Sequence, residues 1–435
     1  MELTKGAPPS TARIAVASFI GTAIEFYDFY VYGTAAALVF GQVFFPTVSP
    51  LAGQLAAFAT FAVGFVARPL GAILFGHFGD RIGRKRMLIV SLVTMGLATI
   101  AVGVIPSFET IGVAAPILLT LARFVQGIGL GGEWGGAVLL ATEYAPARRR
   151  GLFSAFPQLG PAVGFVLGNA LFIVLSLAMT REAFLSIGWR IPFLASAVLL
   201  GVGYYIRVRI AETPVFRAAL EERAPAPVPF VELLRARAGV LVLATMSFVL
   251  AHTLFYTVTT FTLSYATTTL QLDRTVVLVA TMIAVAIMGA ATLGAAVWSD
   301  RLGRRRLCIA AAALAAVWAF PLFWLIDTRD PALITLGATG ALLCFALLYG
   351  PMGAFLPELF PIRYRYSGAS FAYSASGIVG GGVSPIVATD LLQRTGSTTG
   401  VSVYVAGIAV VGLLALLPLR ETKDADFTDG LVTVT

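Results

Sequence analysis

The stretch FGDRIGRKR, residues 78–86, decides the fold of this chain because a close copy, WSDRLGRRR, recurs at residues 298–306. A second segment, EYAPARRRG at 143–151, has a looser copy in ELFPIRYRYSG at 358–368. In each half of the sequence the first segment follows the second long apolar run, and the other segment follows the fourth. Copies at corresponding positions indicate that the chain contains a duplicated unit.

Apolar runs of membrane length surround these segments. A helix needs about 20 residues to cross the roughly 30 Å hydrocarbon layer of a bilayer. Twelve runs meet this requirement, at approximately 13–40, 51–77, 87–105, 111–141, 152–177, 190–207, 239–266, 275–299, 307–326, 332–356, 366–392 and 399–419. The sequence therefore predicts an all-α integral membrane protein, with twelve transmembrane helices in two pseudo-symmetric six-helix halves.

The composition excludes a soluble protein. Of the 435 residues, 58% are hydrophobic and only 12% are charged, and the mean hydropathy is +0.89. Soluble domains are about half apolar and about a quarter charged. The two cysteines, Cys308 and Cys344, lie in apolar runs and have neither the spacing of metal ligands nor that of a disulfide framework. We therefore expect no metal and no cofactor.

The longest polar connection, residues 208–238, contains EERAPAPVPF and separates six apolar runs from six. It divides the chain into an N-terminal half, 1–207, a cytoplasmic linker, 208–238, and a C-terminal half, 239–435, that ends in a short tail. In transporters built from a duplicated six-helix unit, the substrate site lies between the halves near the membrane midplane. The tail has no heptads that would form a coiled coil, so we expect a monomer.

The distribution of positive charge predicts the orientation of the chain. The termini and the even-numbered connections hold 23 lysines and arginines, whereas the odd-numbered connections hold five. Cytoplasmic loops are enriched in these residues, so we expect both termini in the cytoplasm and a multi-pass protein of the plasma or inner membrane. The net charge of +8 comes from these short clusters, and we therefore expect no nucleic-acid partner.

Two acids, Glu25 and Asp28, interrupt the first apolar run within IEFYDFYVYG at 24–33. Counted from Arg13, they lie roughly 18 Å and 22 Å deep at about 1.5 Å per residue. A charge at such a depth costs about 3 kcal/mol, so an intramembrane acid is a functional hypothesis by default. Each of the two is a candidate proton carrier, and Glu133 in the fourth run is a third.

Two arginines, Arg68 and Arg123, lie near mid-membrane by the same count. Pairing them with Glu25 and Asp28 lowers the cost of burial, and protonation of an acid then frees its arginine. We therefore predict these pairs, with Arg68 or Arg123 holding a substrate carboxylate through two parallel hydrogen bonds. A static structural ion-pair network is the alternative, and Glu133 has a structural pairing as its alternative.

Polar and aromatic residues of other runs are candidates for the substrate pocket. His252, Tyr256 and Thr259 or Thr260 follow the i, i+4 and i+7 or i+8 spacing of one helix face, as expected of a wall that lines a wet cavity. Further candidates are Gln158 and Asn169 in the fifth run, Tyr373 and Ser374 in the eleventh, and Tyr27, Tyr30 and Tyr32 beside the acids. For His252 the alternative is a hydrogen bond to a neighbouring hydroxyl group, and for the aromatic residues it is packing against helices or lipid.

Several motifs carry a family resemblance. GHFGDRIGRKR at 76–86 resembles the loop signature of the major facilitator superfamily. RFVQG at 123–127 resembles the fourth-span motif that this superfamily associates with proton coupling, which implies that role for Arg123 as well. Five longer stretches, from IEFYDFYVYGTAAALVFGQVFFP to ELFPIRYRYSGAS, are similar to its metabolite:proton symporter family. That resemblance implies uptake of a compound such as shikimate, oxoglutarate, citrate, proline or betaine together with protons.

The same resemblance implies a gate at the cytoplasmic side. Its candidate residues are Gly76, Asp80, Arg81, Gly83 and Arg84 in the first loop, Asp300, Arg301 and Arg304 in the second, and Glu143 and Glu358 in the other pair of copies. A carboxylate such as Asp80 can accept hydrogen bonds from the first amides of a neighbouring helix, and Gly76 lets that helix approach closely. Ala296 and Ser299 replace glycines in the second loop, so we expect looser packing there. The alternative is that the charges only anchor the loops.

Motifs for ATP hydrolysis and for common hydrolases are absent from the sequence. The only lysines are Lys5, Lys85 and Lys423, so there is no phosphate-binding loop, and neither H-E-x-x-H nor G-x-S-x-G occurs. We therefore predict a secondary transporter, not an enzyme, that takes up a small organic acid with protons by alternating access. A zwitterion such as proline or glycine betaine is the first alternative, followed by a proton-driven efflux antiporter and a non-transporting sensor.

Overall fold

The computed structural model describes residues 11–82, 84–143, 145–146, 149–208, 229–361 and 365–424. Within these ranges the chain forms helices and no strand. Eleven of the described helices are long and apolar enough to cross a membrane. The remaining predicted span, the first, is helical without a break from Thr11 to Phe44. The twelve predicted spans are therefore all present, and the predicted all-α fold is confirmed.

The N-terminal half contains the first six spans. Span 1 joins α1 (Thr11–Ala35), the π-helical η1 (Ala36–Phe40) and α2 (Gly41–Phe44), and it is followed by α3 (Pro50–Ile82) and α4 (Arg84–Val104). Span 4 joins α6 (Ala114–Gly131) and α7 (Glu133–Glu143), span 5 joins α8 (Arg150–Gln158) and α9 (Gly160–Ala178), and span 6 is α11 (Ile191–Val208). The short helices α5 (Phe108–Ile111), α10 (Arg181–Ser186) and η3 (Gly188–Arg190) lie between the spans.

The C-terminal half repeats this plan. Span 7 joins α13 (Pro229–Tyr256), the π-helical η4 (Thr257–Phe261) and α14 (Thr262–Thr268). It is followed by α15 (Arg274–Leu302), α16 (Arg304–Asp327) and α17 (Pro331–Glu358). Span 11 joins α18 (Arg365–Gly377), the π-helical η5 (Ile378–Val383) and α19 (Ser384–Thr395), and span 12 is α20 (Thr399–Leu416).

The predicted linker, 208–238, is described only in part. Residues 209–228 lie outside the described residues, and residues 229–238 belong to α13. Proline has no amide hydrogen to lose in the first helical turn, which makes Pro229 a suitable start. The helix kinks at Arg237, where φ is −143°, and this kink marks the point at which the apolar run begins.

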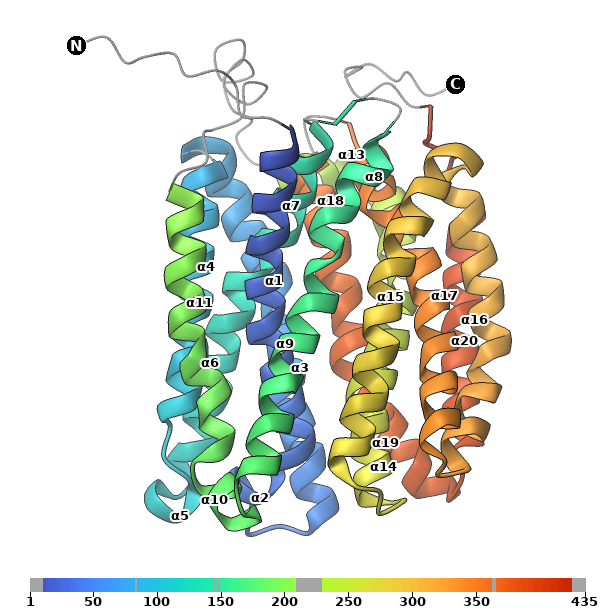
Figure 1. The fold of residues 1–435 in the computed structure, drawn as a ribbon. Helices are drawn as coiled ribbons and strands as arrows, with labels where there is room; N and C mark the ends of the chain where they lie inside the picture. The colour runs from blue at the N-terminus through green and yellow to red at the C-terminus, as the bar shows by residue number, and fades with distance from the viewer. Residues whose placement is uncertain are drawn as a thin grey trace, which may run out of the picture.

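The two halves meet along two pairs of spans. α3 packs against α18, and α8 and α9 pack against α15 (Figure 1). In the order of the repeat, spans 2 and 8 correspond, as do spans 5 and 11, so the two contacts are related by the pseudo-symmetry. The start of α1 and the end of α20 lie at the same end of the bundle, at the top of Figure 1, as an even number of spans requires.

Spans 2 and 4 approach each other closely at glycines. A Cβ atom at Gly71 would lie 2.0 Å from the carbonyl oxygen of Ile128, and one at Gly131 would lie 1.9 Å from the carbonyl oxygen of Arg68. Backbone atoms cannot swing aside as a side chain can, so only glycine permits this approach. The contact holds Arg68 of α3 and Arg123 of α6 in one region, where both guanidinium groups stack on the same phenylalanine ring.

Gly131→Ala is expected to lower the thermal unfolding temperature and to weaken transport together, because the added methyl group forces α3 and Arg68 to shift. Overpacking of this kind costs about 1–3 kcal/mol. The measurement is thermal unfolding of the purified protein in detergent. Gly407→Ala is the matched control, since no atom lies within 4 Å of a Cβ at that position. Equal unfolding temperatures for the two variants would contradict the close contact.

Candidate functional site

Arg123, on α6, is buried among aromatic rings. Its guanidinium group donates a hydrogen bond to the side chain of Gln126 and lies 4.0–4.8 Å from the centres of three rings, those of Phe29, Tyr32 and Phe61. The Gln126 amide in turn donates to Thr99 Oγ1 at 2.7 Å and to the carbonyl oxygen of Asp28 at 3.3 Å. Arg123 is therefore linked to the backbone beside one of the two acids, but not to its carboxylate.

Arg68, on α3, forms no ion pair in the part of the chain that the structure describes. It is 0% exposed, and none of its three guanidinium nitrogen atoms has a hydrogen-bond partner among the described residues. Three rings surround it at 5.1–5.6 Å, those of Phe29, Phe65 and Tyr373. These cation–π contacts offset part of the cost of burying the charge. No described residue supplies Arg68 with a carboxylate.

The predicted pairing of the acids with these arginines is wrong. Glu25 forms an ion pair with Arg207, near the end of α11, and the Asp28 carboxylate accepts a hydrogen bond from the Ser196 hydroxyl, also on α11. In the described part of the chain, Asp28 forms no ion pair. The sequence places Arg207 at the cytoplasmic end of a span, but an arginine side chain is long enough to reach inward from there, and Glu25 lies within its reach.

Glu133 belongs to the same cluster as Glu25. It is the first residue of α7, it accepts a hydrogen bond from Ser91 at 2.8 Å, and it forms an ion pair with Arg207. One cation from α11 thus contacts carboxylates from α1 and α7. Sequence reasoning missed Arg207 because it lies at the end of the sixth run, 190–207, where it resembles an ordinary cytoplasmic loop charge. Only the structure places it beside Glu25 and Glu133.

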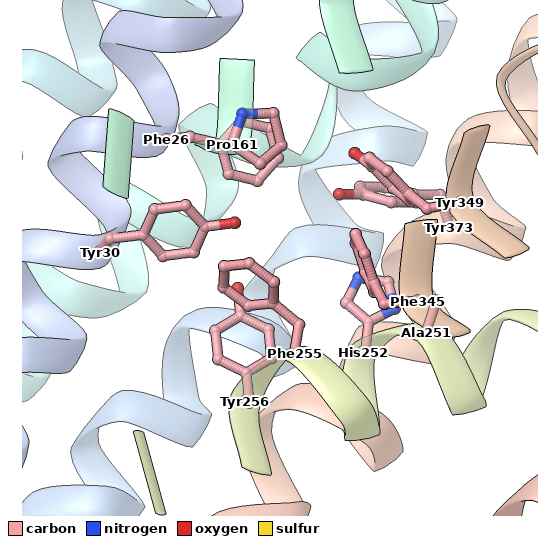
Figure 2. A pocket seen from close by; sticks show the side chains of 10 residues that line it. All are labelled: Phe26, Tyr30, Pro161, Ala251, His252, Phe255, Tyr256, Phe345, Tyr349 and Tyr373. Carbon is pink, nitrogen blue, oxygen red and sulfur yellow. The ribbon is translucent and has the colours of Figure 1, made fainter. Parts of the chain in front are cut away.

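A small cavity lies between the two halves, at the centre of the bundle (Figure 2). Its volume is about 20 Å³, which is room for a single water molecule. The lining residues are mostly aromatic: Phe26, Tyr30, Pro161, Ala251, His252, Phe255, Tyr256, Phe345, Tyr349 and Tyr373. Figure 2 shows the hydroxyl groups of Tyr30, Tyr349 and Tyr373 directed toward one another. A metabolite can enter only if these side chains move apart.

Of the predicted pocket residues beyond the arginines, the ones that line this cavity are Tyr30, His252, Tyr256 and Tyr373. His252 Nδ1 lies 3.3 Å from the hydroxyl oxygen of Ser376, which is the hydrogen bond given as its alternative. Neither Thr259 nor Thr260 lines the cavity, because the π-helical turn that begins at Thr257 changes the spacing after Tyr256.

Tyr27 and Gln158 do not line the cavity. The Tyr27 hydroxyl donates to the carbonyl oxygen of Pro192 at 2.8 Å and so faces α11, whereas Phe26 and Tyr30, four residues apart, share the face toward the cavity. The Gln158 amide donates to the carbonyl oxygen of Tyr349 at 2.6 Å. That bond connects α8 with α17, and a second one, from Trp134 at 2.9 Å, uses the Gln158 oxygen.

The lining residues that sequence reasoning missed come mainly from α13 and α17. The aromatic ones are Phe255, Phe345, Tyr349 and, from α1, Phe26, and the others are Ala251 and Pro161. Each lies in an apolar run, and none carries a charge or a motif that sets it apart from the other residues of that run. Only the packing of the helices identifies them.

At the end of the bundle that holds the termini, an acid of the second loop copy joins the halves. Asp300, on α15, accepts hydrogen bonds from the amides of Gly151 and Leu152 at 3.0 and 3.2 Å, at the start of α8. Arg304 donates to Asp300 at 2.6 Å and contacts both oxygens of Glu358 at 3.3 Å. This is the contact that the sequence predicts for Asp80, and the structure describes it at Asp300.

The looser packing expected at the second loop copy is not observed. A Cβ at Gly151 would lie 2.5 Å from the carbonyl oxygen of Ala296, so here the glycine that permits close approach belongs to α8. A Cβ at Gly76 would lie 3.5 Å from the Tyr366 ring, which is an ordinary contact, so close approach does not require this glycine, contrary to expectation.

Of the remaining predicted gate residues, the structure describes the contacts of Arg301 only. Arg301 is exposed, and its carbonyl oxygen accepts a hydrogen bond from Lys423 Nζ at 3.4 Å. Gly83 lies outside the described residues, as do the side chains of Asp80, Arg81, Arg84 and Glu143.

At the opposite end of the bundle the halves enclose a cavity of about 830 Å³. Its walls include Gln42, Gln54 and Arg181 from the N-terminal half and Thr268 and Arg274 from the C-terminal half. The protein is thus joined across the halves at the arginine-rich end and hollow at the other. This is the asymmetry expected of one state of an alternating-access cycle.

Comparison with known proteins supports this description. Residues 18–385 match the family model described as Major Facilitator Superfamily. The chain is 45% identical to the inner membrane metabolite transport protein YhjE of Escherichia coli and 39% identical to the shikimate transporter of the same organism, each over 95% of both chains. It is 34% identical to the glycine betaine/proline/ectoine/pipecolic acid transporter OusA of Dickeya dadantii, over 95% of this chain and 84% of that one.

A solved structure shares the fold. The xylose transporter XylE of Escherichia coli superimposes with a TM-score of 0.74 and 20% sequence identity, over 95% of this chain and 98% of that one. At this identity the likeness concerns the arrangement of the helices alone. It agrees with the twelve spans and the two halves described above.

Proposed function

The chain belongs to the Major Facilitator Superfamily, and on that premise we propose that it imports a small organic acid together with protons. It is a multi-pass membrane protein that transports a small-molecule metabolite, and it is not an enzyme. The proposal concerns the class of substrate, the coupling to protons and the direction of transport.

The observation that carries the choice of an organic acid is the unbalanced charge of Arg68. A buried guanidinium group with three unused nitrogen donors fits a carboxylate, which accepts two parallel hydrogen bonds from the planar fork. The neighbouring Tyr373 also lines the central cavity. A substrate that enters between the rings of this cavity would therefore lie next to a ring that contacts Arg68. The shikimate transporter among the relatives supports an acid with hydroxyl groups, for which the tyrosines offer partners.

The buried acids Glu25, Asp28 and Glu133 are the proposed proton-binding groups. A carboxylate in the membrane is costly unless it is paired or protonated, so these groups are suited to binding and releasing a proton during the cycle. Arg123, in the motif associated with proton coupling, is linked to the Asp28 backbone through Gln126.

The asymmetry of the bundle fits the outward-facing state in which an importer would receive its substrate. The end rich in arginine is the one we assign to the cytoplasm, and the hollow end then faces outward, ready to receive substrate. We assign the protein to the plasma or inner membrane as a monomer with both termini inside. An efflux antiporter would use the same cavities in the opposite direction.

A zwitterion such as glycine betaine is the second candidate. Aromatic rings bind quaternary ammonium groups through cation–π contacts, and the cavity is built largely of such rings. No acid lines it among the described residues, so the rings, rather than Glu25 or Asp28, are the groups that would hold the cation. The similarity to OusA supports this candidate.

Calorimetric titration of the purified protein separates the two candidates. The ligands are shikimate, a dicarboxylate, proline and glycine betaine, and the matched control for each acid is its methyl ester, which has the same shape but no anionic charge. We expect an acid to bind and its ester to fail. Binding of betaine alone would favour the zwitterion, and binding without transport in vesicles would indicate a sensor.

A further inference from the structure

Three charged side chains from three spans meet near the arginine-rich end of the N-terminal half. They are Glu25 of α1, Glu133 of α7 and Arg207 of α11, and Arg207 forms an ion pair with each acid. The two acids are 1% and 0% exposed, and Arg207 is 8% exposed. We call these three residues the shared-cation cluster. It contains one positive charge and two groups that can each carry a negative charge.

Among the described side chains, no second cation contacts the cluster. From α4, Ser91 donates to Glu133 at 2.8 Å and the carbonyl oxygen of Leu88 accepts from Arg207. Glu25 Oε2 has no hydrogen-bond partner among the described residues. The next charged groups among the described side chains are Arg68 of α3, which acts on Glu25 at longer range, and Asp28, one turn further along α1.

The cluster has one cation for two acids. If both acids were ionised, the cluster would hold a net charge of −1 away from water, and an uncompensated buried charge costs several kcal/mol. A proton on one acid removes that charge and leaves the other paired with Arg207. We propose that Glu25 and Glu133 share a single proton, and that Arg207 is the positioning residue that sets this number at one.

This inference rests on the proposed function, because it identifies the shared proton as the one that is transported. Arg207 is the most exposed member of the cluster and belongs to the end of α11 nearest the arginine-rich side. When the halves separate at that side, water reaches Arg207 and solvates the cluster. Two ionised acids beside one cation then become tolerable, and the proton leaves toward the cytoplasm.

Glu133→Gln tests the proposal, since it leaves one carboxylate beside one cation and so removes the need for a proton. We expect the stimulation of uptake by an inside-alkaline gradient to disappear in proteoliposomes, while exchange of labelled for unlabelled substrate persists. Glu25→Gln is expected to do the same, and it serves as the second variant if Glu133→Gln does not fold. Glu182→Gln, on an exposed acid of α10, is the matched control and retains the stimulation.

Arg207 is tested by the number of protons moved per substrate. Arg207→Lys keeps one positive charge and is expected to keep the wild-type ratio. Arg207→Gln leaves two neutral acids that have no cation to favour ionisation, so the ratio is expected to fall to zero. A purely structural role would lower the unfolding temperature of Arg207→Gln without changing the ratio, and that outcome would overturn the proposal.

Infrared spectroscopy detects the shared proton directly, with no measurement of transport. With ¹³C-labelled glutamate to separate glutamate from aspartate, the band of protonated glutamate carboxyl groups is expected in the wild type and absent in Glu133→Gln. Persistence of the band in Glu133→Gln would overturn the proposal, as would loss of gradient stimulation in Asp28→Asn but not in Glu133→Gln. A wild type that ignores the gradient yet loses the band in Glu133→Gln would instead overturn the proposed proton coupling and leave the shared proton standing.

Discussion

Arg68→Gln is expected to abolish high-affinity binding of the substrate acid and, at the same time, to raise the unfolding temperature of the protein. Loss of one partner of a buried charge pair costs about 2–5 kcal/mol of binding free energy, or roughly 30-fold to several thousand-fold in affinity. The stabilisation follows because the empty protein holds Arg68 without an anion, and replacing a buried, unbalanced charge by a neutral group of similar size removes its cost. Calorimetric titration and thermal unfolding measure the two effects.

Two further arginine variants complete this test. Arg68→Lys keeps the charge but cannot make two parallel hydrogen bonds, so we expect an intermediate affinity. Arg394→Gln is the matched control, because the Arg394 side chain is 75% exposed and pairs with Asp390 on the same helix. A structural role for Arg68 predicts the opposite pattern, in which Arg68→Gln lowers the unfolding temperature and leaves the affinity of the folded protein unchanged.

Arg304→Gln is expected to open the arginine-rich end of the bundle. Arg304 is the cation that Asp300 and Glu358 share, and Asp300 in turn holds the start of α8. Breaking a buried ion pair by removing one partner costs about 3–5 kcal/mol, and opening relieves this cost because water then reaches the unpaired carboxylates. The populations should therefore shift toward the state that is open at this end.

Spin labels at Arg149 and Leu302 report this shift, because both positions are exposed and they lie in different halves near the contact. The distance between the labels, measured by pulsed electron paramagnetic resonance, is expected to increase in Arg304→Gln. The neighbouring Arg306→Gln, whose side chain is exposed, provides the control. An unchanged distance distribution in Arg304→Gln would show that the Arg304 ion pairs do not hold the halves together.

The fold follows from the sequence because the bilayer imposes strong requirements. Every span needs a long apolar run, and the repeated loop motifs pair the spans of one half with those of the other. The boundaries are less predictable, since helices extend beyond the apolar layer. The predicted second span, 51–77, is part of a helix that runs from Pro50 to Ile82, because the polar residues after position 77 continue the same helix.

The sequence predicts which charged residues belong to the candidate site, but not which acid pairs with which arginine. Charge in an apolar run singles out Glu25, Asp28, Arg68 and Arg123, yet depth alone does not determine which acid meets which arginine. Arg207 lies at the end of a span, and its long side chain extends inward to Glu25. The sequence alone therefore does not identify it as the partner of Glu25. Similarly, Tyr27 and Tyr30 look alike in sequence, and only the packing of α1 against α11 separates them.

The central claim is the import of an organic anion driven by protons, and uptake by proteoliposomes tests it most directly. Labelled substrate and the internal pH are recorded together, with and without an inside-alkaline gradient. We predict that the substrate accumulates above its external concentration only with the gradient, that the interior acidifies as it enters, and that Arg68→Gln does neither. Entry to the same final level with or without the gradient, at constant internal pH, would contradict the account.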